Sequence, residues 1–148
     1  MKILKPYHRI QIGYAMLGLA LTAEGFLILS FLKYGNPVGC VLLTLVLGFL
    51  SACFFSLQVT VDNVAVRLKF GIGLIQKEIP LDQILSCMRV KNFFLAGWGV
   101  RRIGRTKGWS YSVSGWDAVE LTLTSGQRIK IGTGNPEGLL QAIREKIR

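Results

Sequence analysis

Two long apolar runs dominate the N-terminal part of the chain. Residues 10–32 contain a single charge, Glu24, and residues 37–57 contain none. Each run is long enough for a transmembrane helix, which needs about 20 apolar residues. Residues 33–36, between the runs, are polar or turn-forming. The pattern therefore predicts two membrane-spanning helices joined by a tight external turn and preceded by a short basic N-terminus, residues 1–9.

Beyond residue 57 the apolar positions alternate with polar ones. Such alternation is typical of strands that bury one face, and turn-forming residues separate one strand from the next. A short extended piece is also expected near residues 110–113. The pattern predicts seven strands, over residues 57–62, 64–70, 74–79, 84–90, 100–103, 118–124 and 127–131.

The end of the chain carries the signals of an amphipathic helix. Asn135 can cap it, Pro136 suits its first position and Glu137 suits its first turn. Apolar residues then recur at helical spacing, at Leu139, Leu140, Ile143 and Ile147. Residues 58–148 are therefore expected to form one α+β, mainly β domain. Its antiparallel strands make a bent sheet or barrel, and the helix closes the open end.

Composition and charge fit this division and set the orientation. The 148 residues are 51% hydrophobic and 18% charged, with 18 Lys and Arg against 8 Asp and Glu. Roughly 90 residues remain for a soluble domain, which excludes a large multidomain enzyme. Basic residues flank both runs, whereas only Lys33 lies between them. Because positive residues stay inside, both termini and the domain are expected on the cytoplasmic face of the membrane.

A secretory signal peptide is the alternative for the first run, since basic residues precede it and Ala23 could end a cleavage motif. However, the run continues for nearly ten residues past Ala23, and a second span follows. A signal peptide is followed instead by a polar mature sequence. The first run is therefore expected to be retained.

Metal and catalytic chemistry are not indicated. Cys40, Cys53 and Cys87 form no CxxC pair, and His8 is the single histidine. The usual Cys/His metal sites cannot be assembled from these residues, and no serine of the domain has a histidine base within it. We expect a non-enzymatic protein without a metal or cofactor.

Two features of the apolar runs suggest further roles. The carboxyl of Glu24 would serve as a proton or ion site in a small transporter, or would stay protonated and hydrogen-bond another helix. Small residues, which let helices approach closely, share one face of each run. These faces are expected to close the hairpin on itself or on a second copy. They comprise Ala15, Gly18, Thr22 and Gly25 on the first run and Thr44, Gly48 and Ser51 on the second.

Several segments of the domain, taken in order, resemble a known family. They are Phe70-Gly71, residues 79–84 (IPLDQI), 97–101 (GWGVR), 111–115 (YSVSG), 118–121 (AVEL) and 131–133 (IGT). The order resembles that of small bacterial membrane proteins with a pleckstrin-homology-like (bacterial PH) domain after one or two transmembrane helices. The resemblance covers the whole domain. It implies a PH-like fold, which is a seven-stranded bent barrel capped by a C-terminal helix, and a location in the bacterial inner membrane. It implies no activity.

Residues 97–111 combine basic and aromatic side chains with no acid among them. Near an anionic leaflet each basic residue contributes about 1 kcal/mol, or about 4 kcal/mol for four. The alternative is a solvated positive face with Trp98 and Trp109 in the core. In phosphoinositide-binding members of the wider fold, basic residues surround the first hairpin turn, which here is the acidic Asp62-Asn63. The predicted lipid or partner surface comprises Trp98, Arg101, Arg102, Arg105, Lys107, Trp109 and Tyr111.

Nucleic acid is a rival partner for a chain of net charge +10. The positive-inside topology already accounts for the cytoplasmic Lys and Arg, so no nucleic-acid partner is expected. The sequence predicts a membrane-anchored binding or scaffold module whose partners are membrane lipids and a protein or a second copy of the chain. The alternative is a small transporter or membrane-assembly component that uses Glu24.

Overall fold

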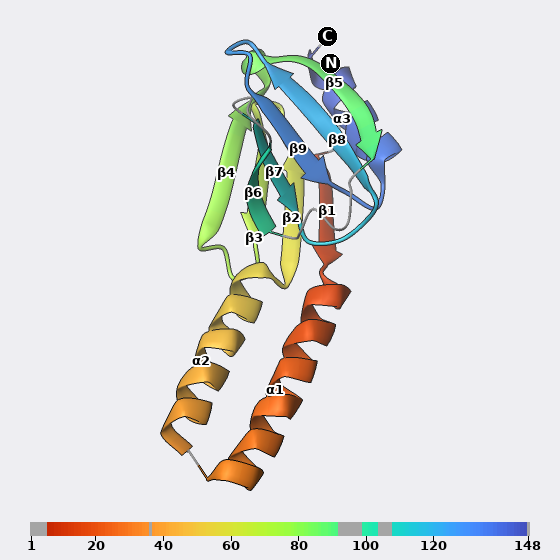
Figure 1. Ribbon diagram of the computed structural model, residues 1–148. Coiled ribbons are helices and arrows are strands. Elements are labelled where there is room, and N and C mark those ends of the chain that lie inside the picture. Colours follow the sequence, from red (N-terminus) through yellow and green to blue (C-terminus); the bar gives the residue numbers. More distant parts are fainter. Residues whose placement is uncertain (1–5, 36, 92–98, 104–107, 148) are drawn as a thin grey trace.

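The computed structural model describes residues 6–35, 37–91, 99–103 and 108–147. Within these ranges the chain forms a helical hairpin that projects from a domain of two sheets and a C-terminal helix (Figure 1). The α+β class is therefore confirmed. Nine strands are present in the described ranges, where seven were expected. The additional strands are β1 (Tyr7–Ile12) and β7 (Gly108–Ser112), the second of which overlaps the extended piece expected near 110–113.

The hairpin consists of α1 (Tyr14–Tyr34) and α2 (Pro37–Phe54). Both helices are long and apolar enough to cross a membrane, and Cys53 is their one buried residue in the described part of the chain. Gly35 ends α1 in the left-handed conformation, with φ of 66°, and its N–H donates to Phe31 O at 2.9 Å. The two predicted spans thus correspond to two helices, with different boundaries.

The boundaries differ because the chain enters and leaves the hairpin through paired strands. The first span was expected to begin at Ile10, but that residue lies in β1, which pairs antiparallel with β2 (Ser56–Val61). The second span was expected to end at Leu57, which lies in β2. The register runs from Tyr7 opposite Val61 to Ile12 opposite Ser56. An apolar run does not show where a helix ends and a strand begins. Here the helix ends are decided by the pairing of β1 with β2, strands that are separated by 43 residues of the chain.

The strands form two sheets. The first is the antiparallel order β1-β2-β3-β4, with β3 at Ala65–Phe70 and β4 at Ile75–Pro80. A 3-10 helix, η1 (Leu81–Gln83), leads to the second sheet. Its order is β5-β8-β9-β7-β6, comprising β5 (Ile84–Lys91), β6 (Gly99–Ile103), β7, β8 (Asp117–Leu123) and β9 (Arg128–Gly132).

One strand pair corrects the expectation of purely antiparallel strands. β7 and β9 run parallel, with Trp109 opposite Ile129 and Tyr111 opposite Ile131. After β7 the chain crosses to the far side of the sheet and forms β8, and β9 then returns between them. A pattern of alternating residues marks each strand but does not show which strand lies beside it, so this crossover was not predicted.

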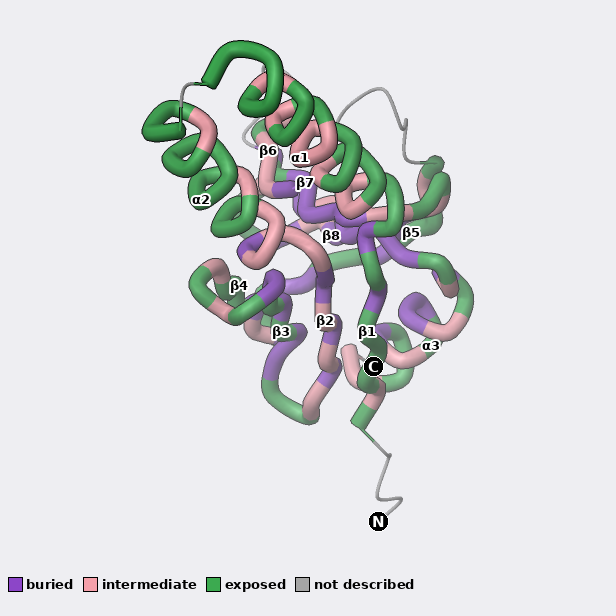
Figure 2. Tube along the Cα trace, turned by 90° about the horizontal axis from the view of Figure 1, so that it is seen from below, coloured by how far each residue is buried: buried purple, intermediate pink, exposed green. Residues whose placement is uncertain are grey.

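The core lies between the inner faces of the two sheets and α3 (Pro136–Ile147) (Figure 2). The helix packs on β5, β8 and η1 and buries Leu139, Leu140 and Ile143. Its predicted cap is confirmed, since Gly138 N–H donates to Asn135 Oδ1 at 3.1 Å. At its far end Lys146 Nζ donates to Val61 O at 3.3 Å and to Asn63 Oδ1 at 2.8 Å. The helix therefore joins the second sheet to the β2–β3 hairpin.

Candidate membrane-interface site

The junction between the hairpin and the domain is short on both sides. Gly13 alone separates β1 from α1, and Phe55 alone separates α2 from β2. The two connecting residues are joined to each other, because Gly13 N–H donates to Phe55 O at 2.7 Å. A Cβ on Gly13 would lie 3.0 Å from Val113 O, so the junction also packs against the chain beyond β7. The strand pair thus continues directly into the helix pair without a flexible linker.

The β3–β4 turn, residues 71–74, fastens the end of α2 to the first sheet. Ile72 N–H donates to Ala52 O at 3.2 Å, and Gly71 N–H donates to Ser56 O at 2.8 Å. The last carbonyls of a helix have no intrahelical partner, so the turn satisfies one of them. Gly71 has a φ of 43°, and a Cβ there would lie only 2.1 Å from Ala52 O. Glycine is required at this contact for both reasons.

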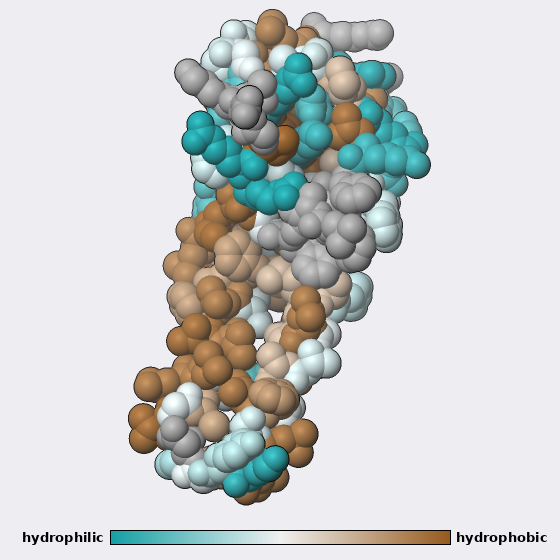
Figure 3. All heavy atoms as spheres, viewed as in Figure 1, coloured by the Kyte–Doolittle hydropathy of each residue, from teal (hydrophilic) through white to brown (hydrophobic). Residues whose placement is uncertain are grey.

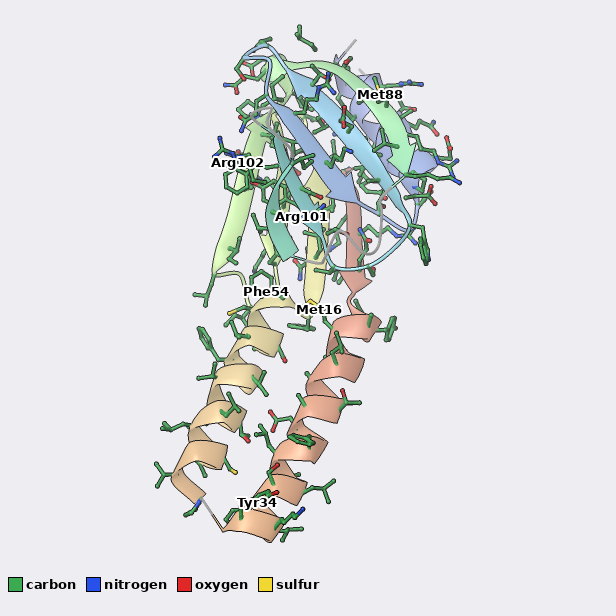
Figure 4. All side chains as sticks on the ribbon, viewed as in Figure 1. Met16, Tyr34, Phe54, Met88, Arg101 and Arg102 are labelled. Carbon is green, nitrogen blue, oxygen red and sulfur yellow. The ribbon has the colours of Figure 1, made fainter. Side chains whose placement is uncertain are left out.

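An aromatic cluster continues the connection into the core. Phe54, at the end of α2 (Figure 4), packs edge-on against Phe70 of β3, with ring centroids 6.0 Å apart. Phe70 also contacts Tyr111 of β7 at 6.1 Å and is 1% exposed. The three rings therefore link the hairpin to both sheets.

Large apolar side chains are exposed on both sides of this junction. Ile72 and Leu74 of the β3–β4 turn are 56% and 65% exposed, and Tyr14 and Trp116 on the β1 side are 74% and 66% exposed. We call these four residues the junction rim. The apolar surface of the helices meets the polar surface of the domain at this level (Figure 3). Tyr and Trp are enriched at membrane–water interfaces, so the rim has the composition of an interfacial belt.

The sequence analysis did not find the rim. A signal was nevertheless present in the β3–β4 turn, where Ile72 and Leu74 alternate with Gly71 and Gly73. Turns are normally polar, and two large apolar residues in one turn call for an apolar environment. Trp116, between Gly115 and Asp117, gives a similar signal.

The structure distributes the predicted basic-aromatic surface over several environments. Trp98, Arg105 and Lys107 lie outside the described residues. Arg101 and Arg102 are neighbours on β6 and therefore face opposite sides of the second sheet (Figure 4). Arg101 is half-buried, whereas Arg102 is exposed and lies opposite Trp109 of β7, which is 37% exposed. Among the described residues these side chains do not form one continuous surface.

Tyr111 corrects one residue of that prediction. It is 6% exposed and contacts Phe70 in the core, so the expectation that it faces lipid or a partner is wrong. Burial raises the pKa of its phenol above the ordinary value of 10.0, because the charged form loses its hydration. Tyr111 lies beside the fully buried Ile131 of β9, so this end of β7 lies in the core, although Trp109 on the same face of the strand is 37% exposed.

Ion pairs hold the far sides of the domain together. Arg89 of β5 pairs with Asp117 Oδ1 at 3.0 Å and with Glu137 Oε1 of α3 at 2.8 Å. The hydrogen bonds that Arg89 donates, first to Asp117 and then to Glu137, raise the pKa of its guanidinium. On the first sheet Arg67 pairs with Asp62, so the acidic β2–β3 turn carries its own counterion. The described residues contain no group of three His, Cys, Asp or Glu side chains that could hold a metal.

Within the hairpin, Glu24 is half-buried on α1, and the described residues provide no hydrogen bond or ion pair to its carboxyl. The glycines of the small-residue faces make no close contact between the helices. A Cβ on Gly18, Gly25 or Gly48 would meet nothing within 4 Å. Contact of these faces with a second copy stays a prediction.

Comparison with known proteins adds no relative. No family model matches the chain, and neither the curated proteins nor the solved structures contain a match.

Proposed function

We propose that this chain is a non-enzymatic binding or scaffold module of a bacterial inner membrane, anchored by α1 and α2, with its β domain held in a fixed orientation at the cytoplasmic surface. The observation that carries the proposal is the pair of one-residue connections at Gly13 and Phe55. A domain joined rigidly to two spans presents the same surfaces at a fixed height above the bilayer, which suits a binding or scaffold role.

A PH-like fold for the domain is part of this proposal. Two packed sheets with a C-terminal helix that contributes Leu139 and Ile143 to the core are consistent with a bent barrel closed by a helix. Two features depart from the simplest such barrel. Its first strand, β1, precedes the membrane hairpin, and β7 pairs in parallel with β9.

Membrane lipid is the partner that the junction rim supports best. Ile72 and Leu74 present apolar surface on the same side as the apolar helices, and Lys69 and Lys77 are exposed beside them. This combination suits an anionic leaflet, because the apolar residues enter the interface while the ammonium groups remain at the phosphate level. Arg102, which is exposed on β6, would add to the same attraction.

The proposed orientation predicts a specific pattern of thiol labelling. In a full chain without its natural cysteines, a Tyr34→Cys variant is expected to react with a membrane-impermeant maleimide on intact spheroplasts. A Ser125→Cys variant, in the β8–β9 turn, is expected to react only after lysis, because the domain lies on the cytoplasmic side. Reaction of Ser125→Cys on sealed spheroplasts, or release of the chain by alkaline carbonate, would overturn the proposal.

The alternative, a small transporter or assembly component that uses Glu24, draws on one observation. Its carboxyl is half-buried within α1 and has no partner among the described residues. Intramembrane acids without structural partners often mark ion pathways. Proton flux into proteoliposomes that disappears in Glu24→Gln would favour this function over the binding module.

A further inference from the structure

A pocket of about 570 Å³ lies where β1 continues into α1, and nothing in the proposed function so far uses it. Its walls come from three parts of the chain, namely β1 and the start of α1, the β7–β8 connection, and the β9–α3 connection. The residues that carry the argument are Arg9, Gln11, Tyr14, Trp116 and Gly134. Pockets of about 300–1,000 Å³ accommodate small-molecule ligands.

The pocket lies at the depth of lipid head groups if α1 spans the membrane. The 21 residues of α1 extend about 30 Å at about 1.5 Å per residue, which equals the thickness of the hydrocarbon core. Tyr14, the first residue of the helix, is then at the boundary of that core. Ile12 lies on the domain side of Tyr14, and Ala15 continues the pocket wall along α1 toward the acyl chains.

The positive side of the pocket is uncompensated. Arg9 is exposed, no lining residue is acidic, and no ion pair of Arg9 occurs in the part of the chain that the structure describes. Its Nη2 atom reaches across from β1 to within 3.9 Å of the Cβ position on Gly134. The first turn of α1 adds backbone N–H groups, because its N-cap is Gly13 and no side chain caps it. Guanidinium and helix N-terminal amides are both ligands for phosphate.

Gln11 contributes a polar side chain to the wall of the pocket. It is only 7% exposed, and its Nε2 donates to Gly132 O at 2.9 Å, which joins β1 to the end of β9. Its Oε1 is closed off from solvent and has no hydrogen-bond partner among the described residues. The amide therefore holds this wall in place, and the pocket's own polar chemistry comes from Arg9 and the start of α1.

We propose that this pocket binds the head group of one phospholipid of the cytoplasmic leaflet. Arg9 and the first amides of α1 hold the phosphate, and Trp116 covers the outer side. The acyl chains follow α1 from Ala15 into the bilayer. This inference rests on the proposed placement of α1 in the membrane. It goes beyond the nonspecific attraction of the junction rim to the bilayer, because it assigns one bound phospholipid to each chain.

The test is native mass spectrometry of the full chain, extracted in mild detergent from membranes of phosphatidylethanolamine and phosphatidylglycerol. Wild type is expected to retain one phospholipid after extended washing. Arg9→Gln is expected to weaken retention about tenfold or more, because it removes a charged hydrogen bond to the phosphate. The matched control is Arg128→Gln, the same change at the end of β9 away from the helices (Figure 1), and it is expected to retain the lipid.

Equal retention by wild type and Arg9→Gln, with both folded by circular dichroism, would overturn the inference. So would displacement of the lipid by inorganic phosphate or glycerol phosphate at equal concentration, since the pocket would then select a soluble phosphate. These outcomes are separate from a failure of the proposed function. The thiol labelling described above tests the membrane placement in cells, whereas retention is measured on the extracted chain.

Discussion

Replacement of Gly71 by alanine is expected to destabilise the protein by more than about 3 kcal/mol. A non-glycine residue in a left-handed conformation costs about 1–2 kcal/mol, and Gly71 has a φ of 43°. In addition, the new Cβ would lie 2.1 Å from Ala52 O and 2.5 Å from Cys53 O, both backbone atoms of α2. The turn must therefore move away from the helix, which breaks the hydrogen bond from Ile72 to Ala52.

The measurement is the thermal unfolding of the full chain in detergent, followed by circular dichroism. The matched control is Gly126→Ala, because Gly126 has a φ of 77° but open space around its Cβ position. That variant has only the conformational cost, about 1–2 kcal/mol. If both variants lowered the melting temperature equally, the contact between the β3–β4 turn and α2 would not contribute to stability.

Replacement of Phe70 by alanine is expected to cost about 3–5 kcal/mol, the usual range for a buried phenylalanine. Phe70 is 1% exposed and its ring lies between those of Phe54 and Tyr111. Its loss leaves a cavity where α2, β3 and β7 meet. We therefore expect two effects, a lower stability of the domain and greater mobility of the domain relative to the hairpin.

Denaturation of the full chain in mixed micelles measures the first effect, and nitroxide line shapes at the end of α2 measure the second. Phe70→Leu, which refills part of the cavity, is expected to recover most of both. Val64→Ala serves as a surface control, because Val64 is 69% exposed. A Phe70→Ala variant as stable as Val64→Ala would show that the aromatic cluster does not join the hairpin to the sheets.

Local signals in the sequence were sufficient for many of the elements. Asn135, Pro136 and the apolar stripe of Leu139 and Ile143 predicted α3, because a helix is determined by residues three or four apart. Strands such as β3 and β8 followed from alternation, since one face of each is buried. The two long apolar helices followed from length and hydropathy alone.

The remaining features depend on contacts between residues distant in the sequence. β1 was taken for the start of a span because Ile10 and Ile12 are apolar, and only its pairing with β2 makes it a strand. The crossover that places β9 beside β7 leaves no local pattern. The junction rim was missed for a related reason, since Ile72 and Trp116 lie next to the apolar hairpin only through the direction in which the sheets continue into α1 and α2.

The position of β1 also determines how this protein can be studied. A fragment that begins at Leu57 would lack β1 and would leave the edge of β2 unpaired along its five remaining residues, 57–61. Unpaired edges favour aggregation, so a fragment without β1 is a poor substitute for the full chain. The domain and the α1–α2 hairpin form one structural unit, so a tilt of the helices also moves the two sheets.

The central claim is that the domain is held against the bilayer with the rim at the interface. Nitroxide labels in the reconstituted full chain, at Ile72→Cys, Trp116→Cys, Asn63→Cys and Ser125→Cys, test it through collision with oxygen and with a water-soluble nickel chelate. The first two labels are expected at the phosphate level, and the last two in water about 15–20 Å further out, the length of a six-residue strand. Equal nickel accessibility at all four positions would contradict a fixed domain.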